Sequence, residues 1–390
     1  MIARLKVESV VHGGEALARH EGRVVFVRGA APGDVVEAEL SGEGRFEHAR
    51  ALRILQPGTA RVDAPCPIVD RCGGCPLQHV SYEVQLAAKQ ELTADALERI
   101  GGFARGSYEL RPIVPSPLQF RYRRRAAMRH GGFAQAGTAL VTRVDECLLF
   151  EPLLQEMASL VREAPEVRLL AGARSGALDV RGLPRKRAAA LLESRLIRGV
   201  IADGVVIGDP VVVDPPLPNG ARLRLRPDTF AQANRSMVPL LQAEVVTALA
   251  GVERLLELFC GSGTLTLPLL GARQVTAVES AGPALALLRK SADEADLAVK
   301  LIAGDAAEVA RSVDDRFDAV LLDPPRTGAA EAVKALSARR VVYVSCDAPT
   351  LARDGKLLAA GGYKLVTATP MDLFPQTAHF EVVATFVRQS

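Results

Sequence analysis

The chain has 390 residues, of which 48% are hydrophobic, and a formal net charge of +3 at pH 7. This composition excludes general disorder, and the length predicts two or three domains, each with its own core. No uninterrupted apolar stretch approaches the roughly 18 to 20 residues of a membrane span, and residues 1–8 carry charges where a signal peptide would be apolar. We therefore expect a cytoplasmic protein without a membrane partner. So small a net charge means that a nucleic-acid partner must be inferred from local motifs.

The first 55 residues or so predict a small β-barrel. Short alternating stretches, such as 23–27 and 34–40, are separated by turns that contain glycine and proline, as is typical of small barrels. The segments Gly-Glu-Ala-Leu-Ala-Arg at 14–19 and Pro-Gly-Asp-Val-Val at 32–36 resemble the TRAM module, an OB-like RNA-binding barrel. The alternative is a small barrel that serves only in packing.

Three cysteines, Cys66, Cys72 and Cys75, lie in a loop rich in proline and glycine. With six cysteines in all, the chain has too few for a disulfide scaffold, so their spacing indicates metal or catalytic chemistry. Cys147 is the best candidate for a fourth ligand. Four thiolates suit either zinc or an iron–sulfur cluster, and the C-x5-C-x2-C spacing does not decide between them. The alternative is three unligated cysteines packed in the loop.

The middle of the chain predicts one helix and then a β-rich region. Apolar residues recur at helical spacing over 82–100, and two glycines follow where the helix would end. Residues 111–228 are rich in strand patterns. Within them, five arginines surround Tyr122 at 121–129, which we interpret either as a phosphate-binding and base-stacking surface or as a solvated strand face.

From about residue 229 the pattern changes to alternating strands and helices. The predicted strands cover 255–260, 274–279, 299–303, 317–323 and 340–346, and the predicted helices cover 237–249, 265–270, 284–295 and 329–336. Repeated strand–helix units predict a doubly wound parallel sheet. A final antiparallel hairpin of 364–369 and 380–387 closes the chain.

The ends of these strands carry residues suited to a nucleotide cofactor. Gly261 and Gly263 follow one strand, and Glu279 ends the next. Gly-x-Gly lets a ligand approach the backbone, and the acidic residue can accept a ribose hydroxyl. Nicotinamide enzymes and methyltransferases both use this arrangement. The longer G-x-G-x-x-G fingerprint is incomplete, and Asp305 and Asp323 suit S-adenosylmethionine better.

Cys346 ends the apolar strand 340–346, where open α/β sheets bind ligands. In the Asp-Pro-Pro-Arg motif, Arg326 occupies the place of the aromatic residue that amine methyltransferases use to stack on a base, which favours carbon as the methyl acceptor. Pyrimidine C5 is a poor nucleophile, so a thiolate must first add to C6, and a base must later remove the C5 proton. Cys346 is the candidate thiol; the alternative is a buried cysteine that serves only in packing.

Several motifs match those of one enzyme family. They are Phe-Ala-Gln-Ala-Asn (230–234), Leu-Glu-Leu-Phe-Cys-Gly-Ser-Gly (256–263), Asp-Pro-Pro-Arg-Thr-Gly (323–328), Val-Ser-Cys (344–346) with Thr-Leu-Ala-Arg-Asp (350–354), and Asp-Leu-Phe-Pro-Gln-Thr-Ala-His-Phe-Glu (372–381). Through them the chain resembles the RNA 5-methyluridine (uracil-C5) methyltransferases, and it is most similar to the 23S ribosomal RNA branch, which has a TRAM domain and a [4Fe-4S] cluster.

The resemblance implies a class I S-adenosylmethionine-dependent methyltransferase fold in three domains. They are a TRAM-like barrel at 1–55, a β-rich iron–sulfur domain at 56–228 whose helix 82–100 packs on the catalytic domain, and the catalytic domain at 229–390. Cys346 would be the nucleophile and Glu381 the base, with His379 on the same strand face as the rival base. The implied S-adenosylmethionine site comprises Gln232, Phe259, Gly261, Gly263, Thr264, Glu279, Asp305 and Asp323. The implied cluster ligands are Cys66, Cys72, Cys75 and Cys147.

The expected partner of this monomeric enzyme is RNA, with ribosomal RNA ahead of transfer RNA. The alternative substrate is the T-loop uridine of transfer RNA. A non-catalytic RNA-binding or folding factor is the alternative from another class, and the intact Cys346 and Glu381 argue against it. The chain departs from the family pattern at Thr264, at the Cys-Asp-Ala-Pro run 346–349 and at 122–125, which affects RNA contacts rather than the reacting groups.

Overall fold

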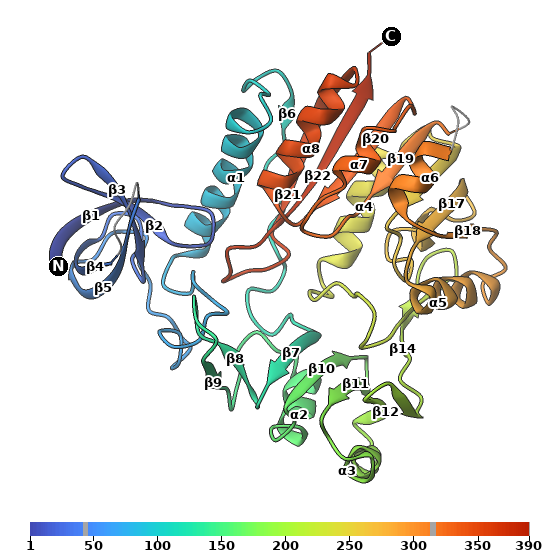
Figure 1. Ribbon diagram of the computed structural model, residues 1–390, viewed down its shortest axis with the longest axis horizontal. Helices are drawn as coiled ribbons and strands as arrows, with labels where there is room; N and C mark the ends of the chain where they lie inside the picture. The colour runs from blue at the N-terminus through green and yellow to red at the C-terminus, as the bar shows by residue number, and fades with distance from the viewer. Residues whose placement is uncertain (42–45, 313–316, 390) are drawn as a thin grey trace.

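The N-terminal strands form a closed barrel in the order β1-β2-β3-β5-β4 (Figure 1). The computed structural model describes residues 1–41, 46–312 and 317–389. The barrel strands are β1 (Ile2–Val10), β2 (Ala16–His20), β3 (Arg23–Arg28), β4 (Val35–Ser41) and β5 (Glu47–Gln56). In β1, Ala3, Leu5 and Val7 point into the barrel core while the residues between them are exposed, as the period of two requires. The predicted barrel is confirmed.

The segment after the barrel packs on the C-terminal sheet. Helix α1 (Tyr82–Arg99) contributes Leu97 to the core that also contains Leu351 of α8 (Ala348–Ala360). The short strand β6 (Glu109–Leu110) pairs in parallel with β21 (Tyr363–Met371) at the edge of that sheet. The helix predicted at 82–100 is therefore present. The three domain boundaries themselves stay a prediction.

A seven-stranded sheet occupies the middle of the chain, in the order β13-β12-β11-β10-β7-β8-β9. Its strands are β7 (Arg125–Arg129), β8 (Gly132–Ala134), β9 (Val141–Arg143), β10 (Glu166–Ala171), β11 (Gly176–Arg181), β12 (Ile197–Ala202) and β13 (Val205–Gly208). Helices α2 (Pro152–Leu160) and α3 (Arg185–Ala190) and the 3-10 turn η1 (Leu191–Ser194) accompany it, and β14 (Val212–Pro216) pairs with β15 (Arg222–Leu225) beside it. The β-rich prediction is confirmed.

We gave two interpretations of the arginine-rich stretch at 121–129, and the structure contradicts the one in which Tyr122 stacks on an RNA base. Tyr122 is only 1% exposed and donates its hydroxyl hydrogen to the carbonyl of Pro375 at 3.0 Å. Arg124 is likewise 1% exposed and forms a two-pronged ion pair with Asp214, at 2.7 and 2.8 Å. Both side chains are therefore bonded to other parts of the protein and are not displayed on its surface.

The C-terminal part is an eight-stranded sheet in the order β18-β17-β16-β19-β20-β22-β21-β6. Its remaining strands are β16 (Arg254–Leu258), β17 (Gln274–Glu279), β18 (Lys300–Ala303), β19 (Ala319–Leu322), β20 (Arg340–Ser345) and β22 (Glu381–Arg388). Strands β16 to β20 are mutually parallel, and β22 runs antiparallel to both β20 and β21. The doubly wound sheet and its closing hairpin are confirmed. The reversed strand β22 lies inside the sheet, between β20 and β21.

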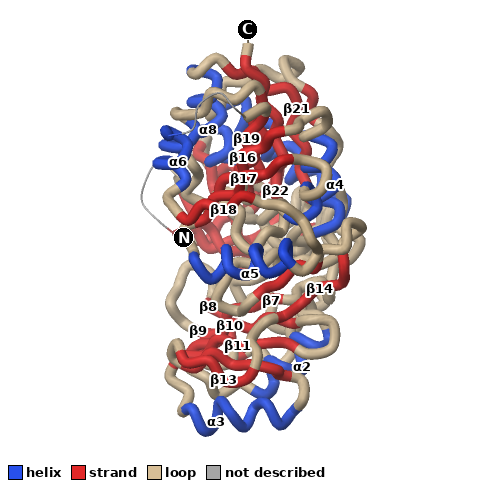
Figure 2. The backbone as a smooth tube through the Cα atoms, turned by 90° about the vertical axis from the view of Figure 1, so that its right-hand side faces the viewer, coloured by secondary structure: helices blue, strands red, loops and turns tan. Residues whose placement is uncertain are grey.

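Helices cover both faces of this sheet, as Figure 2 shows for α4 on one side and α6 and α8 on the other. The helices are α4 (Val238–Ala248), α5 (Gly282–Asp293), α6 (Ala306–Ser312), α7 (Ala330–Val333) and α8. Alternate strand residues divide between two cores: Val342 faces the core of α4 and α5, and Tyr343 faces the core of α1, α7 and α8. The helix predicted at 265–270 is wrong, because only a 3-10 turn, η2 (Leu267–Leu269), follows the glycine loop.

Within the described parts of the chain, every helix is too short or too polar to cross a membrane.

Candidate active site

The sheet brings three of the predicted site residues to one edge. Cys346 directly follows β20, and Asp323 directly follows the neighbouring parallel strand β19. Strand β22 runs the opposite way and begins with Glu381, and Ser345 pairs with Val382. Glu381 therefore enters the sheet at the level where Cys346 leaves it. The register alone places a thiol and a carboxyl side by side.

The thiol of Cys346 is half-buried and lies among charged groups. Burial raises its pKa to about 11, and Glu381 and Asp323 add to the rise. Arg326 interacts with the same thiol and opposes the rise. Arg326 is therefore the group that favours the reactive thiolate at this site. The sequence placed Arg326 in a motif but did not show that it faces the cysteine.

Glu381 is 3% exposed, and its Oε2 has no hydrogen-bond partner. Burial raises its pKa well above the usual range, the charge of Asp323 raises it further, and Arg326 opposes the rise. Burial also raises the pKa of Asp323. A carboxyl group with a raised pKa holds a proton firmly once it has accepted one, which suits a general base.

His379 lies near the same edge but has the opposite electrostatic character. Its Nε2 is 3.4 Å from Nη2 of Arg326, and its ring stacks edge-on against Phe374. Burial together with nearby cations, first among them Arg326, lowers its pKa to about 4. An imidazole with so low a pKa is a weak base at neutral pH.

The loop after β16 has the backbone expected of a close approach to a ligand. Phe259 adopts a φ of +63°, which is rare for a bulky residue and typical of functional sites. A Cβ atom placed on Gly261 would meet nothing within 4 Å, so the backbone there faces open space. Gly263 instead packs against Leu288, where a Cβ would lie 2.5 Å from a side-chain carbon. Glu279 accepts a hydrogen bond from the Gly261 nitrogen at 3.0 Å.

The other predicted cofactor residues come from three segments: Gln232 precedes α4, Thr264 lies in the loop after β16, and Asp305 follows β18. Gln232 is 4% exposed, and its Oε1 has no partner. The carbonyl of Thr264 accepts a hydrogen bond from Gln242 at 2.7 Å. Asp305 follows β18 and accepts hydrogen bonds from two nitrogens at the start of α6, at 2.9 and 3.0 Å. Asp305 therefore orders that helix start.

Two further polar residues near the glycine loop were not predicted as site residues from the sequence. Glu257 in β16 is 2% exposed, and burial raises its pKa to about 8. Ser262 is buried, and its hydroxyl has no hydrogen-bond partner. A carboxyl group within an apolar buried strand is the signal that could have identified Glu257.

The four cysteines predicted as metal ligands come from two loops, one between β5 and α1 and one between β9 and α2. They interact electrostatically: Cys66 raises the pKa of Cys72, and Cys72 and Cys147 each raise that of Cys75, although burial is the larger cause for both. No group of three or more His, Cys, Asp and Glu side chains in the described ranges is arranged to hold a metal ion.

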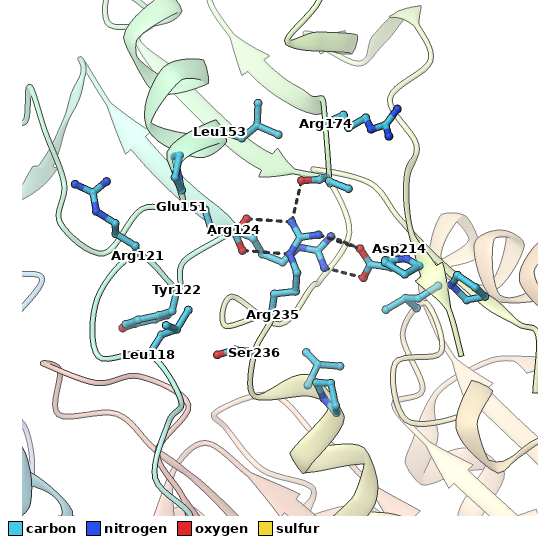
Figure 3. Close-up of a pocket in the computed structure, with 18 of the residues that line it drawn as sticks. Leu118, Arg121, Tyr122, Arg124, Glu151, Leu153, Arg174, Asp214, Arg235 and Ser236 are labelled. Atoms are coloured by element: carbon cyan, nitrogen blue, oxygen red, sulfur yellow. Dashed lines mark hydrogen bonds and ion pairs between the residues drawn. The ribbon is translucent and has the colours of Figure 1, made fainter. Parts of the chain in front are cut away.

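A cavity of about 960 Å³ lies between the central sheet and α4 (Figure 3), and Cys346 is not among its lining residues. Four of its charged groups form two ion pairs: Arg124 pairs with Asp214, and Arg235 pairs with Glu151 at 3.0 Å. None of the predicted catalytic, cofactor or cluster residues lines it. Gln242, which does line it, bonds to the Thr264 carbonyl, so the cavity lies behind the cofactor loop.

Comparison with known proteins agrees with this geometry. The TRAM domain profile matches residues 2–41, and the profile of the tRNA (Uracil-5-)-methyltransferase family matches residues 219–389. The 23S rRNA (uracil(1939)-C(5))-methyltransferase RlmD of Pseudomonas putida is 35% identical, over 98% of this chain and 93% of the relative. The enzyme of the same name from Alkalilimnicola ehrlichii is 34% identical, over 99% and 96%. The chain belongs to the RNA uracil-C5 methyltransferase family.

As a member of this family, the chain is an enzyme that methylates RNA. The solved structure of Pyrococcus abyssi tRNA (uracil-54, C5)-methyltransferase in complex with S-adenosyl-L-homocysteine is 22% identical, with a TM-score of 0.77 over 98% of this chain and 99% of that chain. At this identity the likeness shows the fold, and the predicted class I methyltransferase fold with an N-terminal barrel is confirmed. In this RNA uracil-C5 methyltransferase, the Cys346 edge of the sheet is the candidate active site.

Proposed function

We propose that this enzyme transfers a methyl group from S-adenosylmethionine to C5 of a uridine in 23S ribosomal RNA. The observation that carries the proposal is the meeting of Cys346 and Glu381 at one edge of the sheet, with Asp323 on the adjacent strand. The two relatives reported above bear names that specify a uracil of 23S rRNA, which supports ribosomal RNA as the substrate. We further expect a monomeric enzyme that acts in the cytoplasm.

In the proposed mechanism, Cys346 and Glu381 have sequential roles. The Cys346 thiolate, favoured by Arg326, adds to C6 of the uracil and makes C5 nucleophilic. S-adenosylmethionine, when bound, supplies the methyl group that C5 attacks. Glu381 then removes the proton from C5, the C5–C6 double bond re-forms, and the Cys346 sulfur leaves as a thiolate. The reaction cycle is complete when Glu381 releases the proton taken from C5 to water.

Glu381 is better suited to this proton transfer than His379. The pKa of Glu381 is raised by burial, whereas burial and neighbouring cations lower the pKa of His379 to about 4. A stronger base removes the C5 proton with a larger driving force. His379 remains close enough to contact the substrate, but not as the base.

We assign the S-adenosylmethionine site to Gln232, Phe259, Gly261, Gly263, Thr264, Glu279, Asp305 and Asp323. The residues fit this ligand because Gly261 faces open space and the buried Oε1 of Gln232 has no partner within the protein. These carboxyl groups also suit the positive sulfonium of the methyl donor, because burial raises the pKa of both Asp323 and Glu381 and a nearby positive charge would favour their ionised forms.

We also propose that Cys66, Cys72, Cys75 and Cys147 hold a [4Fe-4S] cluster. The four thiols influence one another's ionisation, so they share one locality. Four thiolates are a ligand set that both an iron–sulfur cluster and a single zinc ion accept. The resemblance of the sequence to the cluster-bearing branch of the family favours the cluster. Bound there, it would join the two loops and stabilise the fold.

Methyl mapping of RNA tests the proposed reaction. The purified enzyme, incubated with labelled S-adenosylmethionine and separate ribosomal and transfer RNA, should form 5-methyluridine in 23S rRNA, and Cys346→Ala should form none. Label in the T-loop of transfer RNA alone would replace the proposed substrate with the alternative. Methyl transfer to C5 by Cys346→Ala would refute the nucleophile.

Anaerobic purification tests the cluster. We expect a brown protein with iron and sulfide in equal amounts and a colourless one when Cys75 is replaced by Ser. A colourless wild-type protein that carries zinc would contradict the cluster and support the zinc alternative.

A further inference from the structure

The barrel does not stand apart from the active site. Its loop between β1 and β2 makes a tight turn in which Gly14 adopts a φ of +84° and lies against the catalytic part: a Cβ there would be 2.7 Å from Pro76 and 3.3 Å from Ala378. Ala378 immediately precedes His379. In Figure 1 the loop before β22, in red, extends from the sheet towards the blue barrel. The barrel loop therefore forms one side of the approach to Cys346.

At this approach the barrel loop presents His12, whose ring is more than half exposed. Its Nε2 lies 3.6 Å from Oδ2 of Asp347, the residue after the nucleophile Cys346. The other oxygen of Asp347 accepts a hydrogen bond from the Thr350 nitrogen at 2.9 Å and so begins α8. Asp347 is thus fixed in place by α8, and it holds the imidazole of His12 beside the entrance. No catalytic step of the proposed mechanism uses His12.

Two other side chains with nitrogen donors, those of Arg326 and His379, lie near the same place. Arg326 contacts His379 at 3.4 Å and interacts with the Cys346 thiol. His12 and Arg326 both lie close enough to His379 to act on it electrostatically. Three segments far apart in the sequence therefore place nitrogen hydrogen-bond donors around one nucleophile. Because a uridine must leave its stack to reach Cys346, its phosphate has to be held near this entrance.

We propose that His12 of the barrel loop, together with Arg326 and His379, binds an RNA backbone phosphate beside the target uridine. This inference rests on the proposed function, since it concerns the same RNA at the same site. It gives the barrel a part in positioning the reacting base, beyond adding affinity for RNA. A phosphate suits these groups because the guanidinium of Arg326 donates charge-assisted hydrogen bonds to its oxygens, and each imidazole ring can donate a hydrogen bond from an N–H group.

Replacement of His12 tests the site, with a 23S rRNA transcript as the probe and single-turnover methyl transfer as the readout. At saturating RNA, His12→Ala should slow transfer about 10-fold, the effect of losing one hydrogen bond to a charged group. His12→Lys, which keeps a cation, should recover most of the rate. In equilibrium binding, His12→Ala should reduce the slope of log K against log salt by about 0.7 to 0.9, as expected for one lost phosphate contact.

The matched control is Lys334→Ala, which removes a similarly exposed cation that is also paired with a carboxylate, Glu331. It should leave both rate and salt slope unchanged. A His12→Ala rate within twofold of wild type would overturn the phosphate site, and so would an equal loss in His12→Lys. If the wild-type enzyme transferred no methyl group to the RNA, the proposed function would be wrong. Because the wild type is measured alongside the variants, this result can be told apart from the loss of the phosphate site alone.

Discussion

Buried carboxyl groups dominate the chemistry of the active-site edge. Burial raises the pKa values of Glu257, Asp323 and Glu381, and Arg326 partly opposes the rise at Glu381. Such groups are costly in the ionised state unless a cation approaches. We interpret this cluster of carboxyl groups as a site that favours a positively charged ligand.

Glu257 should make the fold less stable as pH rises. Its folded pKa of about 8 lies above its ordinary value of 4.5, so the folded state binds the proton more tightly than the unfolded state. Its contribution to stability is complete below pH 4.5 and is lost as pH rises through about 8, on the order of 1 kcal/mol per pH unit within that window. Glu257→Gln stays neutral, so its unfolding free energy in urea should fall less between pH 5.5 and pH 8.

Glu253→Gln is the matched control for this prediction, because Glu253 lies just before β16 and is exposed. Its stability should follow the wild-type pH dependence. Parallel pH curves for wild type and Glu257→Gln would contradict a raised pKa at Glu257.

Arg326 should control the reactivity of the nucleophile. It opposes the burial that raises the pKa of Cys346 to about 11, so Arg326→Gln should raise the pKa further. A rise of about one unit would slow alkylation of Cys346 by iodoacetamide at pH 8 about tenfold, as measured by peptide mass spectrometry. Arg339→Gln, which changes an exposed arginine, should react at the wild-type rate. An unchanged rate in Arg326→Gln would remove Arg326 from thiol activation.

At the residue scale, the sequence predicted where strand ends place reactive groups but not which side chains are buried together. Cys346, Asp323 and Glu381 follow from strand order and motif. The burial of Tyr122 and Arg124 did not, because their partners, Pro375 and Asp214, are remote in the sequence. An arginine at a strand position looks the same whether it faces solvent or a buried carboxylate.

The loop before β22 is the element that sets the position of the proposed base. Residues outside the sheet hold it at several points: Lys89 bonds to Asp372 at 2.6 Å, Gln85 accepts from the Gln376 nitrogen at 3.0 Å, and Tyr122 donates to Pro375. Helix α1 supplies the first two contacts. The loop is therefore fixed from α1 and from the central region, so the position of Glu381 depends on both.

Loss of the Lys89–Asp372 pair should weaken both stability and catalysis. Both side chains are buried, at 1% and 0% exposure, so Lys89→Met leaves Asp372 as an uncompensated charge. Such a loss costs about 3 to 5 kcal/mol, measurable by urea unfolding, and kcat should fall because the loop holds Glu381 less firmly. Arg99→Met, in the same helix but exposed, should cost less than about 1 kcal/mol. A loss in Lys89→Met no larger than that of Arg99→Met would contradict this account of the loop.

At the element scale, most of the sheet was predictable because buried parallel strands are apolar and separated by helices. Two features were not. The helix expected at 265–270 shortened to a 3-10 turn, since Pro268 within that segment cannot continue an α-helical hydrogen-bond pattern. The short strand β6 joins the sheet through pairing with β21, and a two-residue strand carries no detectable period.

At the scale of the whole molecule, a small apolar cluster fastens the barrel to the rest of the chain. Val10 and Ala31 of the barrel region pack with Leu77 and Val80, which lie just before α1. Leu77 also donates its backbone nitrogen to the carbonyl of Gln376 in the loop before Glu381, at 3.1 Å. One residue thus contacts both the barrel and the catalytic loop.

Leu77→Ala should loosen this junction. Leu77 is 1% exposed, and a buried Leu→Ala change costs about 2 to 5 kcal/mol. We expect faster amide hydrogen exchange in β1 and in residues 372–380, with less change in β10 to β12. Leu55→Ala, at an exposed barrel position, should exchange like wild type. Exchange that rises in the barrel alone, with 372–380 unchanged, would contradict coupling through Leu77.

The convergence of three parts of the chain on Cys346 could not be predicted from sequence. Local pattern predicted the barrel and the sheet separately, but the contact of His12 with Asp347 joins positions 335 residues apart and depends on how the barrel docks. Long-range docking leaves no periodic trace in the sequence. The docking of the barrel is recognised only from the structure, where Gly14 packs against Pro76 and Ala378.

The most direct test of the proposed mechanism is a search for the covalent intermediate in Glu381→Gln. With 23S rRNA and S-adenosylmethionine, this variant should form the bond from Cys346 to C6 and transfer the methyl group, but it should fail to release the product. A protein–RNA adduct should then persist on a denaturing gel, carry the methyl label and be absent from Cys346→Ala. Release of methylated RNA at the wild-type rate without an adduct, or an adduct in His379→Gln instead, would contradict the assignment of Glu381 as the base.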